Sequence, residues 1–171
     1  VSNSKEDNLF MLSALTSTVI GKFFLTMLVA MAPVVELRGA IPIGVGYGLD
    51  LPVAFLAALI GNMIPVPFLI IFGGKVFEFL KKHSKLLGGF IRKVEKKAES
   101  KIDAVNKYKW LGLFVFVAIP LPGTGAWTGA AIAIVMEMKL RRAFPPILLG
   151  VLVAGLIISA ITFTAKAALG G

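Results

Sequence analysis

Residues 33–50, P-V-V-E-L-R-G-A-I-P-I-G-V-G-Y-G-L-D, interrupt an otherwise apolar part of the chain and decide how it folds. Glu36 and Arg38 stand there among two prolines and four glycines, and Asp50 ends the stretch. A charge at the centre of a membrane helix costs about 2.5–3.5 kcal/mol on insertion scales, so a function is expected of it. Proline removes a backbone donor, and glycine weakens a continuous helix. We therefore predict a broken, re-entrant segment with Glu36 and Arg38 near its tip.

The composition is that of an integral membrane protein. Hydrophobic residues make up 57% of the 171 residues and charged residues 16%, whereas soluble domains carry about 25% charged residues. This length fits one compact membrane domain over residues 1–171. There is no cysteine and a single histidine, His83, so we expect neither a disulfide, nor a metal site, nor a cofactor.

Positive charge is concentrated in residues 81–109, which hold ten Lys or Arg and three acidic residues. Apolar residues recur there at helical spacing, which predicts an amphipathic helix along the membrane surface. The positive-inside rule places this segment in the cytoplasm and explains its charge without nucleic acid. Contact with anionic lipid head groups is compatible with it. The sequence therefore predicts a multi-pass protein of the inner (cytoplasmic) membrane.

The first half is predicted to hold a hairpin and a span. Residues 9–50 are expected to form an N-terminal helix, interfacial over 9–20, and a first re-entrant hairpin. The apolar run over 21–35 is shorter than the roughly 20 residues that cross a bilayer. A spanning helix is predicted over 51–80, with Asp50 as its N-cap. The stretch G-N-M-I-P-V-P at 61–67 is a weak point of that helix, because its two prolines leave carbonyl groups free.

The second half follows the same plan, with a hairpin over 110–138 and a spanning helix over 143–168. At a spacing of 87 residues, Pro33 falls on Pro120 and Asp50 on Glu137. With 81–109 in the cytoplasm, the two hairpins enter from opposite sides. The predicted fold is an all-α membrane protein of two inverted repeats, each a re-entrant hairpin plus a transmembrane helix, joined by the basic helix. Paired, interrupted apolar segments indicate a transporter site.

Glu36, Arg38 and Asn62 are the polar candidates in the first half. Glu36 can carry a proton, because burial raises the pKa of a carboxyl group. Arg38 can bind an anionic head group, because its planar fork fits phosphate and carboxylate. The alternative is a structural ion pair that closes the turn. Asn62 either faces a substrate at membrane depth or bonds to the backbone of a proline kink.

The second break reads I-P-L-P-G-T-G-A-W-T-G at 119–129. Its free amides can cradle an anion at a helix N-terminus, with plain hairpin geometry as the alternative. Trp127 is an interfacial anchor or a stacking surface, and Arg141 and Arg142 are positive-inside anchors or contacts to lipid phosphate. The candidate substrate- or proton-binding residues are Glu36, Arg38, Pro42, Asn62, Pro120, Pro122, Gly123, Thr124, Gly125, Trp127, Arg141 and Arg142.

The motifs E-L-R-G-A-I-P at 36–42 and I-P-L-P-G-T-G-A-W-T-G at 119–129 resemble the small multidrug export protein family. That family looks related to the wider DedA/VTT group. The resemblance implies two re-entrant hairpins that face each other and translocation of lipid, with bacterial members linked to recycling of undecaprenyl phosphate. It also implies proton coupling by Glu36 and phosphate binding by Arg38. The second motif departs from the usual DedA pattern, because its turn has no arginine or carboxylate.

These features favour a proton-linked translocator of an amphipathic anion such as a lipid phosphate, an undecaprenyl phosphate-like flippase. One alternative is a small multidrug exporter of cationic compounds, with Glu36 as counter-charge. Another is a non-transporting membrane scaffold or assembly factor. No G-x-S-x-G, H-E-x-x-H or P-loop motif occurs, so an enzyme is not expected. The expected partners are membrane lipids, the substrate, protons and a second copy of the chain, because two spans give a polar site thin cover.

Overall fold

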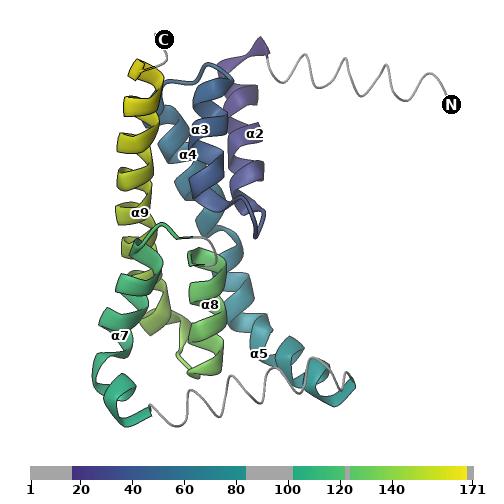
Figure 1. Cartoon of the computed structure of the whole chain (residues 1–171). Helices are drawn as coiled ribbons and strands as arrows, with labels where there is room; N and C mark the ends of the chain where they lie inside the picture. Colours follow the sequence, from purple (N-terminus) through teal and green to yellow (C-terminus); the bar gives the residue numbers. More distant parts are fainter. Residues whose placement is uncertain (1–16, 84–101, 122–123, 169–171) are drawn as a thin grey trace, which may run out of the picture. The chain divides into compact units, whose positions relative to one another are not determined.

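The computed structural model describes residues 17–83, 102–121 and 124–168 (Figure 1). The regular elements in these ranges are all α-helices, so the predicted all-α class is confirmed for them. They are α2 (Val19–Met31), α3 (Glu36–Gly46), α4 (Leu51–Met63), α5 (Pro65–His83), α7 (Ile102–Ala118), α8 (Ala126–Val135) and α9 (Leu140–Ala168). Most of the predicted basic helix over 81–109 and of the interfacial helix over 9–20 lies outside the described residues.

Two stretches are long and apolar enough to cross a membrane, Leu51–Gly74 with 24 residues and Leu140–Ala168 with 29. Large apolar side chains on them are exposed, for example Phe68 at 62% and Phe163 at 66%. Soluble monomeric proteins rarely expose large continuous apolar surfaces. These helices are therefore those of a membrane protein.

The chain divides into two compact units, which are described separately. The first unit comprises Val1–Asn62 and Gly155–Gly171, and the second comprises Met63–Ala154. Helix α9 contributes to both units, because its last turns belong to the first unit and its earlier turns to the second.

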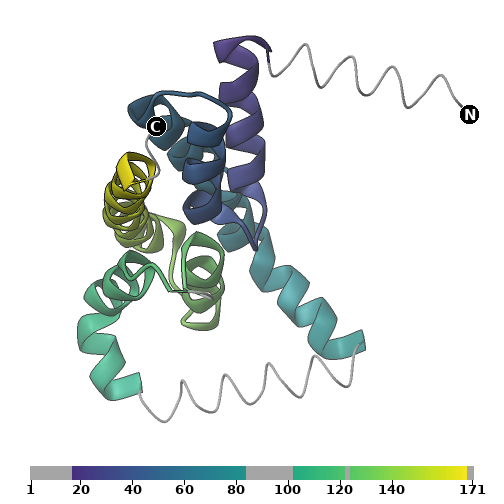
Figure 2. The ribbon, with the colours of Figure 1, turned by 45° about the horizontal axis from the view of Figure 1, so that its top comes forward.

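In the first unit, α2 and α3 form a helical hairpin in which the two helices lie side by side (Figure 2). Thr18 caps α2 by accepting a hydrogen bond from the Gly21 N–H at 3.1 Å. A Cβ on Gly44 of α3 would lie 2.8 Å from Thr26 Oγ1 of α2, so glycine permits their close approach. The helix pair is the first predicted hairpin.

The turn of this hairpin ends before the two charged residues that we predicted near its tip. Glu36 has φ +49°, and its N–H donates to Ala32 O at 2.9 Å, so the chain reverses within residues 32–35. Glu36 and Arg38 therefore lie in the first turn of α3 and not in the loop at the tip. Pro42, predicted to weaken the helix, lies inside α3 with its side chain exposed.

Helix α4 begins at Leu51, as predicted, and the Asp50 carbonyl accepts from the N–H of Ala54 at 2.9 Å. The predicted single helix over 51–80 is two helices, because the chain bends at Ile64, outside any hydrogen-bonded turn. Pro65 and Pro67 cause this break, since neither has an N–H to donate. The last part of α9 packs on the first unit: a Cβ on Gly155 would lie 2.6 Å from the Phe55 ring.

In the second unit, α8 packs against both α5 and α7. Glycines allow the closest approaches: a Cβ on Gly129 would lie 2.6 Å from Val117 Cγ2, and one on Gly150 would lie 2.9 Å from Phe114 O. Helix α9 begins at Leu140, earlier than the predicted 143, and Pro145 and Pro146 lie in its second turn without ending it. The helix pair α7–α8 is the second predicted hairpin.

Helices α3 and α8 end in the same Schellman motif, 89 residues apart. After α3, Leu49 N donates to Gly44 O at 3.0 Å and Gly48 N to Val45 O at 2.9 Å. After α8, Met138 N donates to Ala133 O at 2.8 Å and Glu137 N to Ile134 O at 3.0 Å. The next helix then starts alike in both halves, since the carbonyls of Asp50 and Lys139 each accept from the residues three and four further on. Asp50 therefore corresponds to Lys139 and not to Glu137.

The pattern of burial repeats at the same spacing of 89 residues. The buried positions of α4 at 54, 57, 58, 61 and 62 correspond to the buried positions of α9 at 143, 146, 147, 150 and 151. In the first arms of the hairpins the predicted spacing of 87 holds, because buried Thr26 and Ala30 of α2 correspond to buried Leu113 and Val117 of α7. The spacing thus increases by two residues between the first arms and the helices that follow, and the described parts of the two halves share helix caps and a pattern of burial.

Candidate functional site

The buried polar side chains of the described residues are Thr26, Glu36 and Asn62, and all three lie in the first unit. Their counterparts in the second half are Leu113, Gly125 and Val151. Because both halves form the same helices, the fold does not require a polar residue at any of these positions. The three side chains are therefore candidates for a functional role, and each is considered in turn.

Glu36 is 5% exposed and opens α3 in a left-handed backbone conformation, with φ +49°. A residue other than glycine in this conformation is strained by about 1–3 kcal/mol. Gly125, at the corresponding position of the second half, has φ +137° and meets no such penalty. Burial of a carboxylate adds a further desolvation cost. At this position the first half therefore has a strained, buried glutamate, whereas the second half has a glycine that adopts a positive φ without strain.

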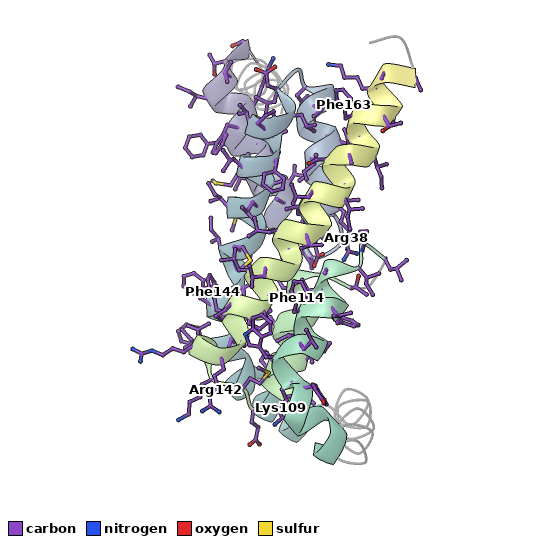
Figure 3. The ribbon with its side chains drawn as sticks, turned by 90° about the vertical axis from the view of Figure 1, so that its left-hand side faces the viewer. Arg38, Lys109, Phe114, Arg142, Phe144 and Phe163 are labelled. Carbon is purple, nitrogen blue, oxygen red and sulfur yellow. The ribbon has the colours of Figure 1, made fainter. Side chains whose placement is uncertain are left out.

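Arg38 lies two residues after Glu36 and is partly exposed (Figure 3). The charge of Glu36 acts on its guanidinium group, so the structure brings these two predicted site residues within electrostatic range. Its counterpart is Trp127, which is likewise partly exposed in α8. A half-exposed guanidinium near a buried carboxylate can neutralise that carboxylate and still present N–H donors to an anion.

Thr26 is fully buried, and sequence reasoning missed it. Its hydroxyl donates to Lys22 O at 2.8 Å, which satisfies the group within its own helix. The only signal in the sequence was a single hydroxyl within an apolar run, which is too common to be informative. Thr26 therefore fills space between α2 and α3 and needs no ligand.

Asn62 is 2% exposed, and its Oδ1 is buried without a hydrogen-bond partner among the described residues. The alternative predicted from the sequence, a hydrogen bond between the Asn62 side chain and the kinked backbone, would run from Nδ2 to a freed carbonyl and stays a prediction. An unpartnered acceptor at this depth is unfavourable unless a ligand or water supplies a donor.

Hydrogen bonds of the Thr124 side chain stabilise the turn of the second hairpin. Thr124 Oγ1 lies 2.6 Å from Ile119 O and 2.8 Å from Leu121 O, and it accepts from Leu121 N at 3.2 Å. Gly125 then caps α8 with φ +137°. This arrangement favours plain hairpin geometry over an anion cradle. Pro120 is partly exposed, while Pro122 and Gly123 lie outside the described residues.

A second polar feature is a cavity of about 380 Å³ in the second unit, lined by Lys109, Trp110, Met136, Glu137, Met138, Lys139 and Arg142. Figure 3 shows Lys109 and Arg142 near the same end of this unit. The lining thus includes three cationic groups, one carboxylate, one tryptophan and two methionines. Of the two predicted arginines, Arg142 lines the cavity, whereas exposed Arg141 does not. Sequence analysis predicted Arg142 and missed Lys109, Trp110 and Lys139.

The family described as Putative small multi-drug export protein matches residues 36–157. The chain belongs to this family. The match begins at Glu36 and includes every predicted site residue, from both hairpins. No curated protein matches the chain, and no solved structure does. Within the described ranges, no three His, Cys, Asp or Glu side chains gather where they could hold a metal ion. The family name and the two candidate spans indicate a membrane protein with a role in export.

Proposed function

We propose that the protein is a proton-linked membrane transporter, not an enzyme, in which Glu36 carries the proton and Arg38 contacts the substrate. The observation that carries the proposal is the buried, strained Glu36 at a position where the second half has glycine. A buried carboxyl group in hydrogen-bond reach of a substrate or water can take up and release a proton, as proton coupling requires. An ionisable residue at membrane depth is otherwise costly.

For the substrate, we favour an amphipathic anion such as a lipid phosphate. Arg38 supports this choice, because its guanidinium is partly exposed and phosphate accepts bidentate hydrogen bonds from arginine. The predicted relation to the DedA/VTT group points in the same direction. The second candidate is a small cationic compound, which the family description favours and for which Glu36 would be the counter-charge. If the protein were a non-transporting membrane scaffold, Glu36 and Arg38 would form an ion pair that only stabilises the turn.

For the arrangement in the membrane, we propose two inverted repeats with re-entrant hairpins in the inner membrane, and a homodimer. The repeated helix caps and burial pattern support a duplicated plan. Each hairpin helix is short for a span: α3 has 11 residues and α8 has 10, and a crossing needs roughly 20. The positive-inside rule places residues 81–109 in the cytoplasm.

Ligand binding by the purified full-length protein tests the function. Native mass spectrometry would compare wild type, Arg38→Lys and Glu36→Gln against polyprenyl phosphates, phospholipids and cationic dyes. A lipid-phosphate transporter should bind a polyprenyl phosphate and lose at least tenfold in affinity with Arg38→Lys, because lysine cannot form the bidentate contact. Arg141→Gln, which removes an exposed arginine, is the matched control and should bind as wild type does.

Proton coupling is then measured in proteoliposomes with the ligand so identified and an imposed pH gradient. Glu36→Gln should bind the ligand yet no longer respond to the gradient. Dye binding that survives Arg38→Lys and fails in Glu36→Gln would replace the anion by a cationic compound. If wild type bound neither class, transport would be the wrong function and the scaffold would stand.

A further inference from the structure

Asn62 sits close to the middle of the 24-residue candidate span Leu51–Gly74, at the deepest point that such a helix reaches in a bilayer. Its side chain is 2% exposed, and its Oδ1 has no hydrogen-bond partner within the described ranges. Bulk water does not reach this depth of a bilayer, so the oxygen needs a bound group as its partner.

Two main-chain carbonyls next to Asn62 lack their helical donors, for the same reason that the helix ends there. Pro65 has no N–H, so the carbonyl of Gly61 cannot receive its helical hydrogen bond. No helical hydrogen bond crosses the bend at Ile64, so the Asn62 carbonyl does not receive one from residue 66 either. These groups form the C-terminal end of α4, where the helix dipole is negative. Side chain and backbone together offer acceptors and negative potential.

The second half supplies an internal comparison. Its equivalent segment is part of α9, which continues without a break through the positions that match Asn62 and Pro65, namely Val151 and Ala154. Glycine is kept at the equivalent positions 61 and 150, where each helix is closely approached by another. The packing is therefore shared by both halves, whereas at these matching positions the unpartnered amide oxygen and the helix break belong to the first half alone.

We propose that the C-terminal end of α4 binds a desolvated cation, through Asn62 Oδ1 and the freed carbonyls of Gly61 and Asn62. Oxygen acceptors at a broken membrane helix are the arrangement that suits small monovalent cations, because they replace water in the ion's hydration shell. The cation can be a free ion such as Na⁺ or the ammonium group of a transported compound, since both need the same acceptors. This inference goes beyond the transport proposed above, because cation binding does not depend on Glu36 or Arg38.

Binding of radioactive Na⁺ to the full chain in lipid nanodiscs tests this site, with choline replacing Na⁺ to hold ionic strength constant. Wild type should bind Na⁺ saturably, and Asn62→Val, which copies Val151, should weaken that affinity at least tenfold. Asn62→Asp keeps an oxygen acceptor and adds charge, so it should bind at least as tightly as wild type. Ser159→Ala is the matched control, because Ser159 Oγ on α9 of the same unit is also buried without a partner. It should leave binding unchanged.

Competition with methylammonium distinguishes the two sources of the cation. If methylammonium displaces Na⁺, or binds where Na⁺ does not, the site takes an ammonium group; if it does neither, the site takes the free ion. The proposal would be overturned if wild type bound neither probe, or if Asn62→Val bound as wild type does, which is the result expected for a buried water. It would also fail if Val and Asp weakened binding equally. The assay needs no transport, so its failure leaves the role of Glu36 open.

Discussion

Gly48 and Glu137 occupy the same position in two matching helix caps, and both adopt the left-handed backbone conformation, with φ +84° and +51°. Each is the residue at which a Schellman motif turns the chain out of a hairpin and into a long helix. Glycine meets no steric penalty there, whereas the Cβ of glutamate crowds the following carbonyl. The same turn is therefore unstrained in the first half and strained in the second.

Exchanging these residues should change stability in opposite directions. Glu137→Gly should raise the free energy of unfolding by about 1 kcal/mol, and Gly48→Ala should lower it by about the same amount. The side chain of Glu137 is exposed, so no buried contact is lost with it. Reversible unfolding in mixed micelles would measure both. Equal stability of Glu137→Gly and wild type would mean that Glu137 makes a compensating contact.

Close helix packing at Gly61 and Gly150 predicts a second pair of effects. A Cβ on Gly61 would overlap the carbonyl oxygen of Met27, and one on Gly150 would lie 2.9 Å from Phe114 O. Since a backbone carbonyl cannot move aside, alanine at either position should cost about 1–3 kcal/mol or more. Gly112→Ala is the control, because no atom lies within 4 Å of its Cβ, and it should be neutral or slightly stabilising. Destabilisation equal at all three positions would contradict the packing argument.

Thr124 is expected to hold the second turn and not to bind a ligand. Thr124→Val removes the hydroxyl that bridges Ile119 O and Leu121 N, and should lower the unfolding free energy by about 0.5–1.5 kcal/mol. Ligand affinity, measured by native mass spectrometry, should stay within twofold of wild type. Thr164→Val, which removes one exposed hydrogen bond to Ala160 O, is the matched control for stability. A tenfold loss of affinity in Thr124→Val would restore the anion-cradle interpretation.

The basic cavity of the second unit predicts retention of anionic lipid. Arg142 lines it together with Lys109 and Lys139, and Trp110 supplies the apolar wall. Arg142→Gln should reduce the number of phosphatidylglycerol molecules that remain bound after detergent extraction, whereas Arg141→Gln should not. Raised salt should weaken retention in wild type, since exposed charges are screened. Equal losses from both variants would indicate a general effect of surface charge and no defined site.

The sequence was sufficient to predict the helical class, the pairing of short helices in two hairpins and the weak point in the first span, whereas re-entry of the hairpins into the membrane stays a prediction. It was sufficient because prolines and glycines interrupt apolar runs at positions that no continuous helix tolerates. The exact turn of the first hairpin could not be predicted, because Glu36 adopts a conformation that propensity assigns to glycine. Glu36 and Arg38 were expected in a loop, and they open a helix.

The spacing of the two halves shows a similar limit. Matching prolines suggested 87 residues throughout, and this holds for the first arms. Beyond the turn the spacing is 89, two residues more than in the first arms, as the matching helix caps show. Only the backbone hydrogen bonds reveal that Asp50 matches Lys139. Among the predicted site residues, the structure adds most to Asn62, because only coordinates can show that its Oδ1 has no hydrogen-bond partner.

The correspondence of Thr26, Glu36 and Asn62 with Leu113, Gly125 and Val151 gives the chain its own reference state. Because these buried polar side chains occur in one half alone among the described residues, the other half shows that the helices form without them. A variant with the substitutions Thr26→Leu, Glu36→Gly and Asn62→Val would carry the residues of the second half at these positions and would be expected to lack transport. This variant would be the negative control that distinguishes transport by the protein from leakage through the bilayer.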